Sequence, residues 1–297
     1  MDRDTLGTLL VLSSAAAFGT LGVLGEVAFR EGLSVPSALA LRFAVGTAVV
    51  WTALLVARAR PGAGTSPPTF TLSPRETAVA LALGAVGYAG VSYGFFVGVE
   101  RMSAGLAAVI LYTYPLFVVA LASVFLDEQV GVRTVAAAGL SLAGVVLISW
   151  TGAAAFDPVG AAATLGAAGL YAAYIVVSRA TLETTDERVL TAYVAPAAAA
   201  SLAVVAVATD AVTVPTTAVG WGAVVALGVV ATAFAVFAFF AGLTRVGAGR
   251  AGVLSTAEPT VAVALGAVFL SEPVTPAMLL GGVLVVGGVV LVQTTAE

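Results

Sequence analysis

An acidic residue, Glu258, interrupts a long apolar stretch and stands directly before Pro259 in VLSTAEPTVAVALGAVFLSE, residues 253–272. Proline lacks an amide hydrogen, so it removes one helical hydrogen bond and bends the helix beside the carboxylate. A carboxylate next to freed backbone carbonyls is suited to bind a proton or a substrate cation. The alternative is a structural role, in which a protonated Glu258 is hydrogen-bonded to a neighbouring helix and serves packing alone.

Two tyrosines precede another proline in a similar setting. Tyr112 and Tyr114 flank Thr113 directly before Pro115, and they offer hydroxyl groups and aromatic faces for ligand binding. At 3.6 residues per turn, positions two apart point about 160° away from each other on a helix. We therefore expect only one of the two tyrosines to face a central cavity.

Three further tyrosines are weaker candidates for a binding site. Tyr171 and Tyr174 are three residues apart and therefore share one helix face, although contact with lipid or packing explains them equally well. Tyr88 lies in an aromatic-rich segment with Tyr93, for which ordinary packing is favoured.

Arg42 and Glu26 are the remaining charged candidates. Arg42 follows Pro36 by nearly two helical turns, and Glu26 approaches the same level from the preceding apolar segment. We expect an ion pair between them, with a structural or gating role favoured over substrate binding.

The residue types that are absent narrow the chemistry further. The 297 residues include no cysteine and no histidine, and all twelve basic residues are arginines. This composition excludes disulfides, thiol or imidazole catalysis and most transition-metal sites, and no Gly-Lys-Ser/Thr phosphate-binding loop occurs. We therefore expect no cofactor, no metal and no enzymatic activity.

The elements that must position these residues are apolar helices. Hydrophobic residues make up 60% of the chain and charged residues 9%, with a mean hydropathy of +1.10, far from the composition of a soluble domain. A helix needs about 20 mostly apolar residues to cross a bilayer. The sequence predicts an all-α membrane protein with ten transmembrane helices, near residues 6–28, 36–57, 77–99, 103–126, 132–150, 158–177, 189–208, 218–243, 247–270 and 276–292.

The arginines predict the orientation of these helices. With the N-terminus in the cytoplasm, nine arginines lie on the cytoplasmic side, and only Arg30 and Arg101 lie outside, in keeping with the positive-inside rule. An even number of spans then places both termini in the cytoplasm.

The two halves of the chain are related by an internal repeat. An offset of 144 residues aligns residues 101–147 with 245–291 without a gap, and 19 of these 47 positions are identical. Pro115 falls on Pro259, and Tyr114 falls on Glu258. We expect one repeat over residues 1–152 and a second over 153–297. Five spans in each half would insert the second repeat upside down, an arrangement found in many secondary transporters.

These features resemble the drug/metabolite transporter superfamily, and specifically its EamA-type members with two five-helix repeats. The resemblance covers about residues 6–292 and depends on AAAFGTLGVLG (15–25), LRF (41–43), YPLFVVALASVFLDE (114–128) and LSTAEPTVAVALGAVFLSE (254–272). One departure is Phe18, at a position where the family often has tryptophan.

The resemblance implies a secondary active transporter of the plasma membrane that works by alternating access. It implies export of a small metabolite, an amino-acid-like compound or a drug, whereas a passive channel and an intramembrane enzyme that uses Glu258 are the rival functions. The expected partners are a small-molecule substrate, the lipid bilayer and a coupling proton, but no nucleic acid. The oligomeric state stays open, with a homodimer as one option.

Overall fold

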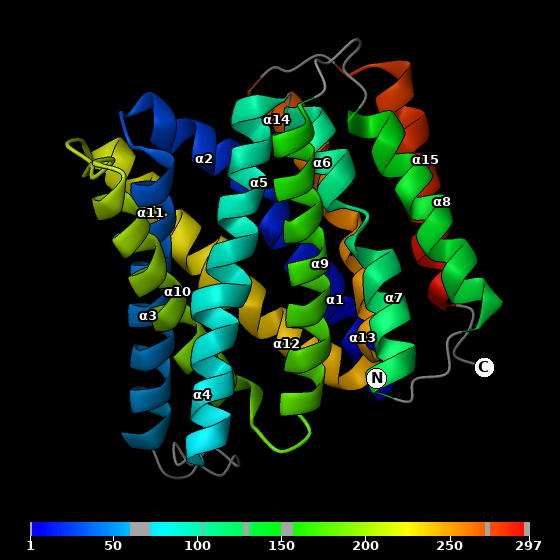
Figure 1. The fold of residues 1–297 in the computed structure, drawn as a ribbon, viewed down its shortest axis with the longest axis horizontal. Coiled ribbons are helices and arrows are strands. Elements are labelled where there is room, and N and C mark those ends of the chain that lie inside the picture. The colour runs from blue at the N-terminus through cyan, green and yellow to red at the C-terminus, as the bar shows by residue number, and fades with distance from the viewer. Residues whose placement is uncertain are drawn as a thin grey trace.

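The computed structural model describes residues 2–59, 72–102, 104–126, 131–149, 157–270 and 274–293, and these residues form a bundle of helices without a strand (Figure 1). In chain order the elements are α1 (Arg3–Gly19), α2 (Leu21–Arg30), α3 (Val35–Ala59), α4 (Pro74–Ala82), the π-helix η1 (Leu83–Tyr88), α5 (Ala89–Arg101), α6 (Ala104–Leu111), α7 (Tyr114–Phe125), α8 (Val132–Ser149), α9 (Pro158–Thr181), α10 (Glu187–Ala208), α11 (Ala218–Gly228), the π-helix η2 (Val229–Phe234), α12 (Ala235–Val246), α13 (Ala248–Ser255), α14 (Ala257–Phe269) and α15 (Pro276–Gln293).

The bundle has the lengths and the apolar character of a multi-pass membrane protein. Within the described residues, seven helical segments are long and apolar enough to cross a membrane, over Arg3–Arg30, Val35–Val56, Pro74–Phe95, Pro158–Thr181, Glu187–Ala208, Ala218–Val246 and Ala248–Phe269. Shorter apolar helices cover Tyr114–Phe125, Val132–Leu147 and Pro276–Leu291.

Polar side chains fix where several helices begin. Ser73 and Glu76 form a capping box at the start of α4, in which each side chain bonds to the backbone of the other residue. Asp157 caps α9 by accepting a hydrogen bond of 2.7 Å from the Gly160 amide. At α1, hydrogen bonds from the amide and hydroxyl of Thr5 lower the pKa of the Asp2 carboxyl group.

Three apolar segments that the sequence presented as continuous helices are each divided in two. The breaks lie at Thr20, at Tyr112–Thr113 and at Thr256. At every break a threonine hydroxyl donates to the carbonyl three residues earlier, a bond that competes with the regular backbone pattern. These hydrogen bonds join Thr20 to Ala17 (2.6 Å), Thr113 to Ile110 (2.7 Å) and Thr256 to Val253 (2.6 Å).

The repeat seen in the sequence recurs in the helix boundaries. Both ends of α6 and α13 are 144 residues apart, and the same holds for α8 and α15. The composite helix α4–η1–α5 begins at 74 and α11–η2–α12 begins at 218, and each contains one π-helical turn. Secondary structure therefore repeats even where sequence identity between the halves is low.

The first helix of each half packs against the third helix of the other half. A Cβ atom added at Gly7 of α1 would lie 2.5 Å from the Cβ atom of Arg245 on α12. In the corresponding contact, a Cβ atom added at Gly160 of α9 would lie 2.9 Å from the Cβ atom of Arg101 on α5. Glycine allows both pairs of backbones to approach closely.

The last helices of the two halves, α8 and α15, lie side by side (Figure 1). A Cβ atom added at Gly144 would meet the main chain and side chain of Val285 at 2.8 Å, and one added at Gly288 would meet Ser141. An offset of 144 converts the first contact into the second. The packing is thus self-complementary, as in an interface with twofold symmetry.

Candidate functional site

Aromatic rings from four segments form one continuous cluster in the middle of the bundle. Tyr171 and Tyr174 of α9 share a helix face, with ring centroids 6.1 Å apart. Tyr114 of α7 lies 4.5 Å from Tyr171, and Tyr88 at the end of η1 lies 5.6 Å from Tyr174. Phe240 of α12 closes the cluster at 6.0 Å from Tyr174.

Arg42 lies at one side of this aromatic cluster, on α3. Its side chain is buried, with 5% of its surface exposed, and its guanidinium carbon lies 4.6 Å from the centre of the Phe43 ring and 5.9 Å from that of Tyr88. Nη2 donates to the hydroxyl of Tyr88 over 3.5 Å. Aromatic faces and one hydroxyl thus hold a cation inside the bundle, and no carboxylate of the described residues bonds to it directly.

Glu258 approaches the same cluster from α14 in the second half. It lies in the first turn of α14, two residues after the break at Thr256, and Pro259 beside it is buried. Tyr112 lies beside its carboxyl group, and Arg42 acts on it through space. The break therefore places the carboxylate at a helix start inside the bundle, where the backbone amides favour negative charge.

The break between α6 and α7 changes the geometry expected for Tyr112 and Tyr114. Their rings lie 6.1 Å apart with an interplanar angle of 45°, because Tyr112 lies in the break and Tyr114 begins the next helix. The estimate of 160° assumed a continuous helix. Tyr114 is buried and its hydroxyl donates to the Gly252 carbonyl over 3.3 Å, whereas Tyr112 is half-buried beside Glu258.

Glu26 does not join this site, and the expected ion pair with Arg42 is wrong. Glu26 instead accepts a hydrogen bond of 2.8 Å from Nε of Arg30 one turn later, and both side chains are exposed. Because α2 is a separate helix after Thr20, Glu26 pairs along the surface of its own helix. Arg42 is left to interact with Tyr88 and, through space, with Glu258.

Two features of the site carry no clear signal in the sequence. Phe43 and Phe240 complete the ring contacts around Arg42 and Tyr174, yet they resemble ordinary apolar residues of their helices. The buried hydroxyl of Tyr174 lacks a hydrogen-bond partner among the described residues. A buried polar atom without a partner marks a position where water or a ligand is expected.

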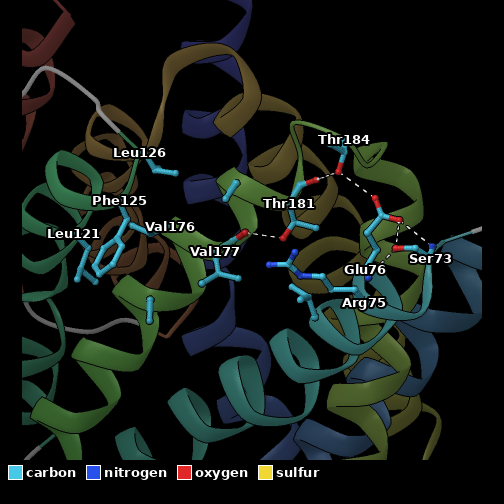
Figure 2. Close-up of a pocket in the computed structure, with 13 residues that line it drawn as sticks. Ser73, Arg75, Glu76, Leu121, Phe125, Leu126, Val176, Val177, Thr181 and Thr184 are labelled. Atoms are coloured by element: carbon cyan, nitrogen blue, oxygen red, sulfur yellow. Dashed lines mark hydrogen bonds between the residues drawn. The ribbon is translucent and has the colours of Figure 1, made fainter.

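A pocket of about 710 Å³ opens between α4, α7 and α9, at the end of the bundle where α4 begins. Figure 2 shows its charged residues on α4, with the Arg75 guanidinium group pointing toward Thr181 and Val177 of α9. Its other walls are mainly apolar, and they include Leu121 and Phe125 of α7. No local sequence pattern indicates this pocket, because its walls come from three segments far apart in the chain.

Comparisons with known proteins agree with this architecture. The profile of the EamA-like transporter family matches residues 5–150 and again residues 158–294. The uncharacterized transporter YwfM of Bacillus subtilis strain 168 is 34% identical over 165 residues. That alignment covers 53% of this chain and 55% of YwfM, so the chain spans about half the length of this curated relative.

A solved crystal structure superposes on nearly the whole chain with a TM-score of 0.83. Its sequence is 26% identical, and the superposition covers 98% of this chain and 97% of the other. The helix bundle is thus a known fold, and the repeated match to one profile accounts for nearly all of the sequence. This chain belongs to the EamA-like transporter family, a non-enzymatic family of membrane transporters within the drug/metabolite transporter superfamily.

Proposed function

We propose that the protein is a secondary active transporter with ten transmembrane helices in two inverted repeats, over residues 1–152 and 153–297. The contacts of α8 and α15 support this arrangement. Gly144 packs against Val285 and Gly288 packs against Ser141, so the two helices run in opposite directions and are exchanged by a twofold rotation. For helices that cross a bilayer, this axis lies in the membrane plane, and the repeats are inverted.

The observation that carries the proposal is a difference between two interfaces that the repeat relates to each other, and each interface is formed by one helix from each half. α11 packs closely on α2, where Ala28, Ala223 and Leu227 form a buried apolar cluster. Their counterparts, α4 for α11 and the end of α9 for α2, are instead separated by the pocket of about 710 Å³. One end of the transport pathway is therefore closed while the other is open, as alternating access requires.

The central site offers binding groups of both charges between these two ends. Arg42 comes from the first half and Glu258 from the second, and tyrosines surround both. In the proposed mechanism this site holds the substrate, a small metabolite, an amino-acid-like compound or a drug. Glu258 binds either the coupling proton or a cationic group of the substrate.

The open end of the pathway corresponds to the cytoplasm in this proposal. The start of α1 shares a polar pocket with Leu182 and Glu187, which follow α9, and the open pocket is lined by Thr181 and Thr184 at the same end. Since the arginines favour a cytoplasmic N-terminus, the structure represents a cytoplasm-facing state. We assign the protein to the plasma membrane with both termini in the cytoplasm, and its direction of transport to export.

A disulfide across the closed end tests alternating access. A Cβ atom added at Gly220 of α11 would lie 3.3 Å from the Cβ atom of Glu31 after α2, close to the separation of about 3.5–4.5 Å found in disulfides. Because the chain has no cysteine, Glu31→Cys with Gly220→Cys introduces one defined pair. In proteoliposomes, oxidation should abolish substrate counterflow and reduction should restore it.

The controls separate a carrier from a channel. Oxidant should leave the two single variants, Glu31→Cys and Gly220→Cys, fully active. Full counterflow by the oxidised double variant would contradict alternating access at this interface. Substrate conductance without any accelerated exchange would identify the protein as a channel and overturn the proposed function.

A further inference from the structure

The pocket between α4, α7 and α9 lies outside the central tyrosine site but leads toward it. Tyr174 and Thr181 are both on α9, and Tyr174 belongs to the central cluster whereas Thr181 lines the pocket. Seven residues of α-helix separate them, a rise of about 10 Å. A molecule in the pocket would therefore be one or two turns from the central site, on its cytoplasmic side in the proposed orientation.

The walls of the pocket are suited to an apolar body. Val79 of α4, Leu121 and Phe125 of α7, and Val176 and Val177 of α9 contribute side chains to it. The volume of about 710 Å³ falls within the range typical of small-molecule sites, which are mostly apolar with a few fixed polar groups.

The mouth of the pocket contains two charged side chains, and only one of them is available to a ligand. Oε2 of Glu76 accepts hydrogen bonds from the amide and hydroxyl of Ser73, at 2.8 and 2.7 Å. Oε1 of Glu76 accepts a third from the hydroxyl of Thr184, at 3.1 Å. A ligand cation would have to compete with the capping box and with this contact between α4 and the end of α9.

Arg75 differs from its neighbour Glu76 in every one of these respects. Its side chain makes no hydrogen bond or ion pair with any residue in the described ranges, and Figure 2 shows its guanidinium group extended into the pocket. Guanidinium presents five donors in a planar fork that matches a carboxylate, and charge-assisted pairs of this kind are the strongest hydrogen bonds in proteins.

We infer that this pocket binds a water-soluble organic anion, with its acidic group on Arg75 and its apolar body between α7 and α9. Polar Ser73, Thr181 and Thr184 surround the mouth, which favours a ligand that arrives from water over a membrane lipid. Capture of this anion on its way to the central site rests on the proposed transport function.

Protection of a cysteine in the pocket tests the inference on the full chain. Ala180 lines the pocket and is exposed, so Ala180→Cys provides a single reactive thiol; Ala208→Cys, at the exposed far end of α10, is the matched control. The probes are 3-phenylpropanoate, its neutral alcohol and its primary amine, tested in phosphatidylcholine nanodiscs. At ten times its dissociation constant, 3-phenylpropanoate should slow alkylation of Ala180→Cys about tenfold, with no effect on Ala208→Cys.

Charge variants identify the group that binds the anion. Adding Arg75→Gln to Ala180→Cys should raise the concentration of 3-phenylpropanoate needed for protection about 10- to 100-fold, as expected when a hydrogen-bonded charge is lost. Arg75→Lys should retain part of it. Arg188→Gln, which removes a charge at the same end of the bundle outside the pocket, should leave protection unchanged. All variants must elute from size-exclusion chromatography as the parent does.

Four outcomes would overturn the inference. The first is equal protection by the alcohol or the amine, and the second is full protection after Arg75→Gln. The third is slow alkylation in nanodiscs with phosphatidylglycerol and no probe, which would assign the pocket to an anionic lipid. Counterflow of any substrate without protection by the anion would refute this inference alone, whereas protection without any counterflow would refute the proposed transport function alone.

Discussion

At the scale of single residues, the central site is asymmetric although the fold around it is repeated. Glu258 corresponds to Tyr114 in the first half, and Arg42 packs against Phe43 and Tyr88. Each charge therefore occurs once beside the tyrosine cluster. A substrate or a proton that neutralises one of them would change the electrostatic balance between the two halves.

Glu258→Gln tests this role of the carboxylate. The amide keeps the shape of the side chain but cannot release or take up a proton. We expect gradient-driven transport to fall to the background of empty proteoliposomes, while expression, insertion and chromatographic behaviour stay unchanged. Exchange without a gradient should survive if Glu258 carries a proton, and should weaken if Glu258 pairs with a substrate cation.

Glu26→Gln is the matched control for that experiment. Glu26 is exposed and paired with Arg30, and an exposed pair contributes about 0–1 kcal/mol to stability. Transport by this variant should equal that of the parent. Normal transport by Glu258→Gln at every pH would show that Glu258 is a packing residue and would refute its assignment to the site.

At the scale of helices, small residues decide how the two halves meet. Gly144 and Gly288 occupy corresponding positions of α8 and α15, and an added Cβ atom at either would come within 3 Å of the facing helix. Real Cβ atoms avoid such contacts, so the helices would have to move apart. Gly139 lies on α8 as well, but a Cβ atom there would meet nothing within 4 Å.

Alanine substitutions at these glycines measure the contribution of this contact. Gly144→Ala and Gly288→Ala should each lower the free energy of unfolding by about 1–3 kcal/mol through overpacking, and Gly139→Ala should leave it unchanged or raise it slightly. Unfolding in detergent, followed by circular dichroism, provides the measurement. Equal stability of all three variants would contradict the close α8–α15 packing.

At the scale of the whole molecule, inversion of the second repeat predicts the sidedness of the connections. Arg188 lies in the first turn of α10 and Asp210 follows that helix, whereas Asp157 precedes α9. If the N-terminus is cytoplasmic, residue 188 lies inside and residues 157 and 210 lie outside. The start and the end of α9 must therefore lie on opposite faces of the membrane, and the same holds for α10.

Single cysteines at these positions test the topology directly, since the chain has no native cysteine. In whole cells, a membrane-impermeant maleimide should label Asp157→Cys and Asp210→Cys at once. Arg188→Cys should be labelled only after the cells are opened. Labelling of Asp157→Cys and Arg188→Cys from the same side would refute the inverted repeat.

The sequence by itself determined the class of the molecule, because composition and periodicity are local properties that an apolar solvent constrains strongly. It predicted an all-helical membrane protein, its internal repeat and its family, and it singled out Glu258 from the cost of placing a charge among apolar residues. Only the tertiary structure decided which candidates meet. The helix breaks at Thr113 and Thr256 bring Tyr112 close to Glu258, and the pairing of Glu26 with Arg30 leaves Arg42 to the tyrosines. The pocket at Arg75 depends on the separation of α4 from α9, a distance between segments far apart in the chain that no local pattern records.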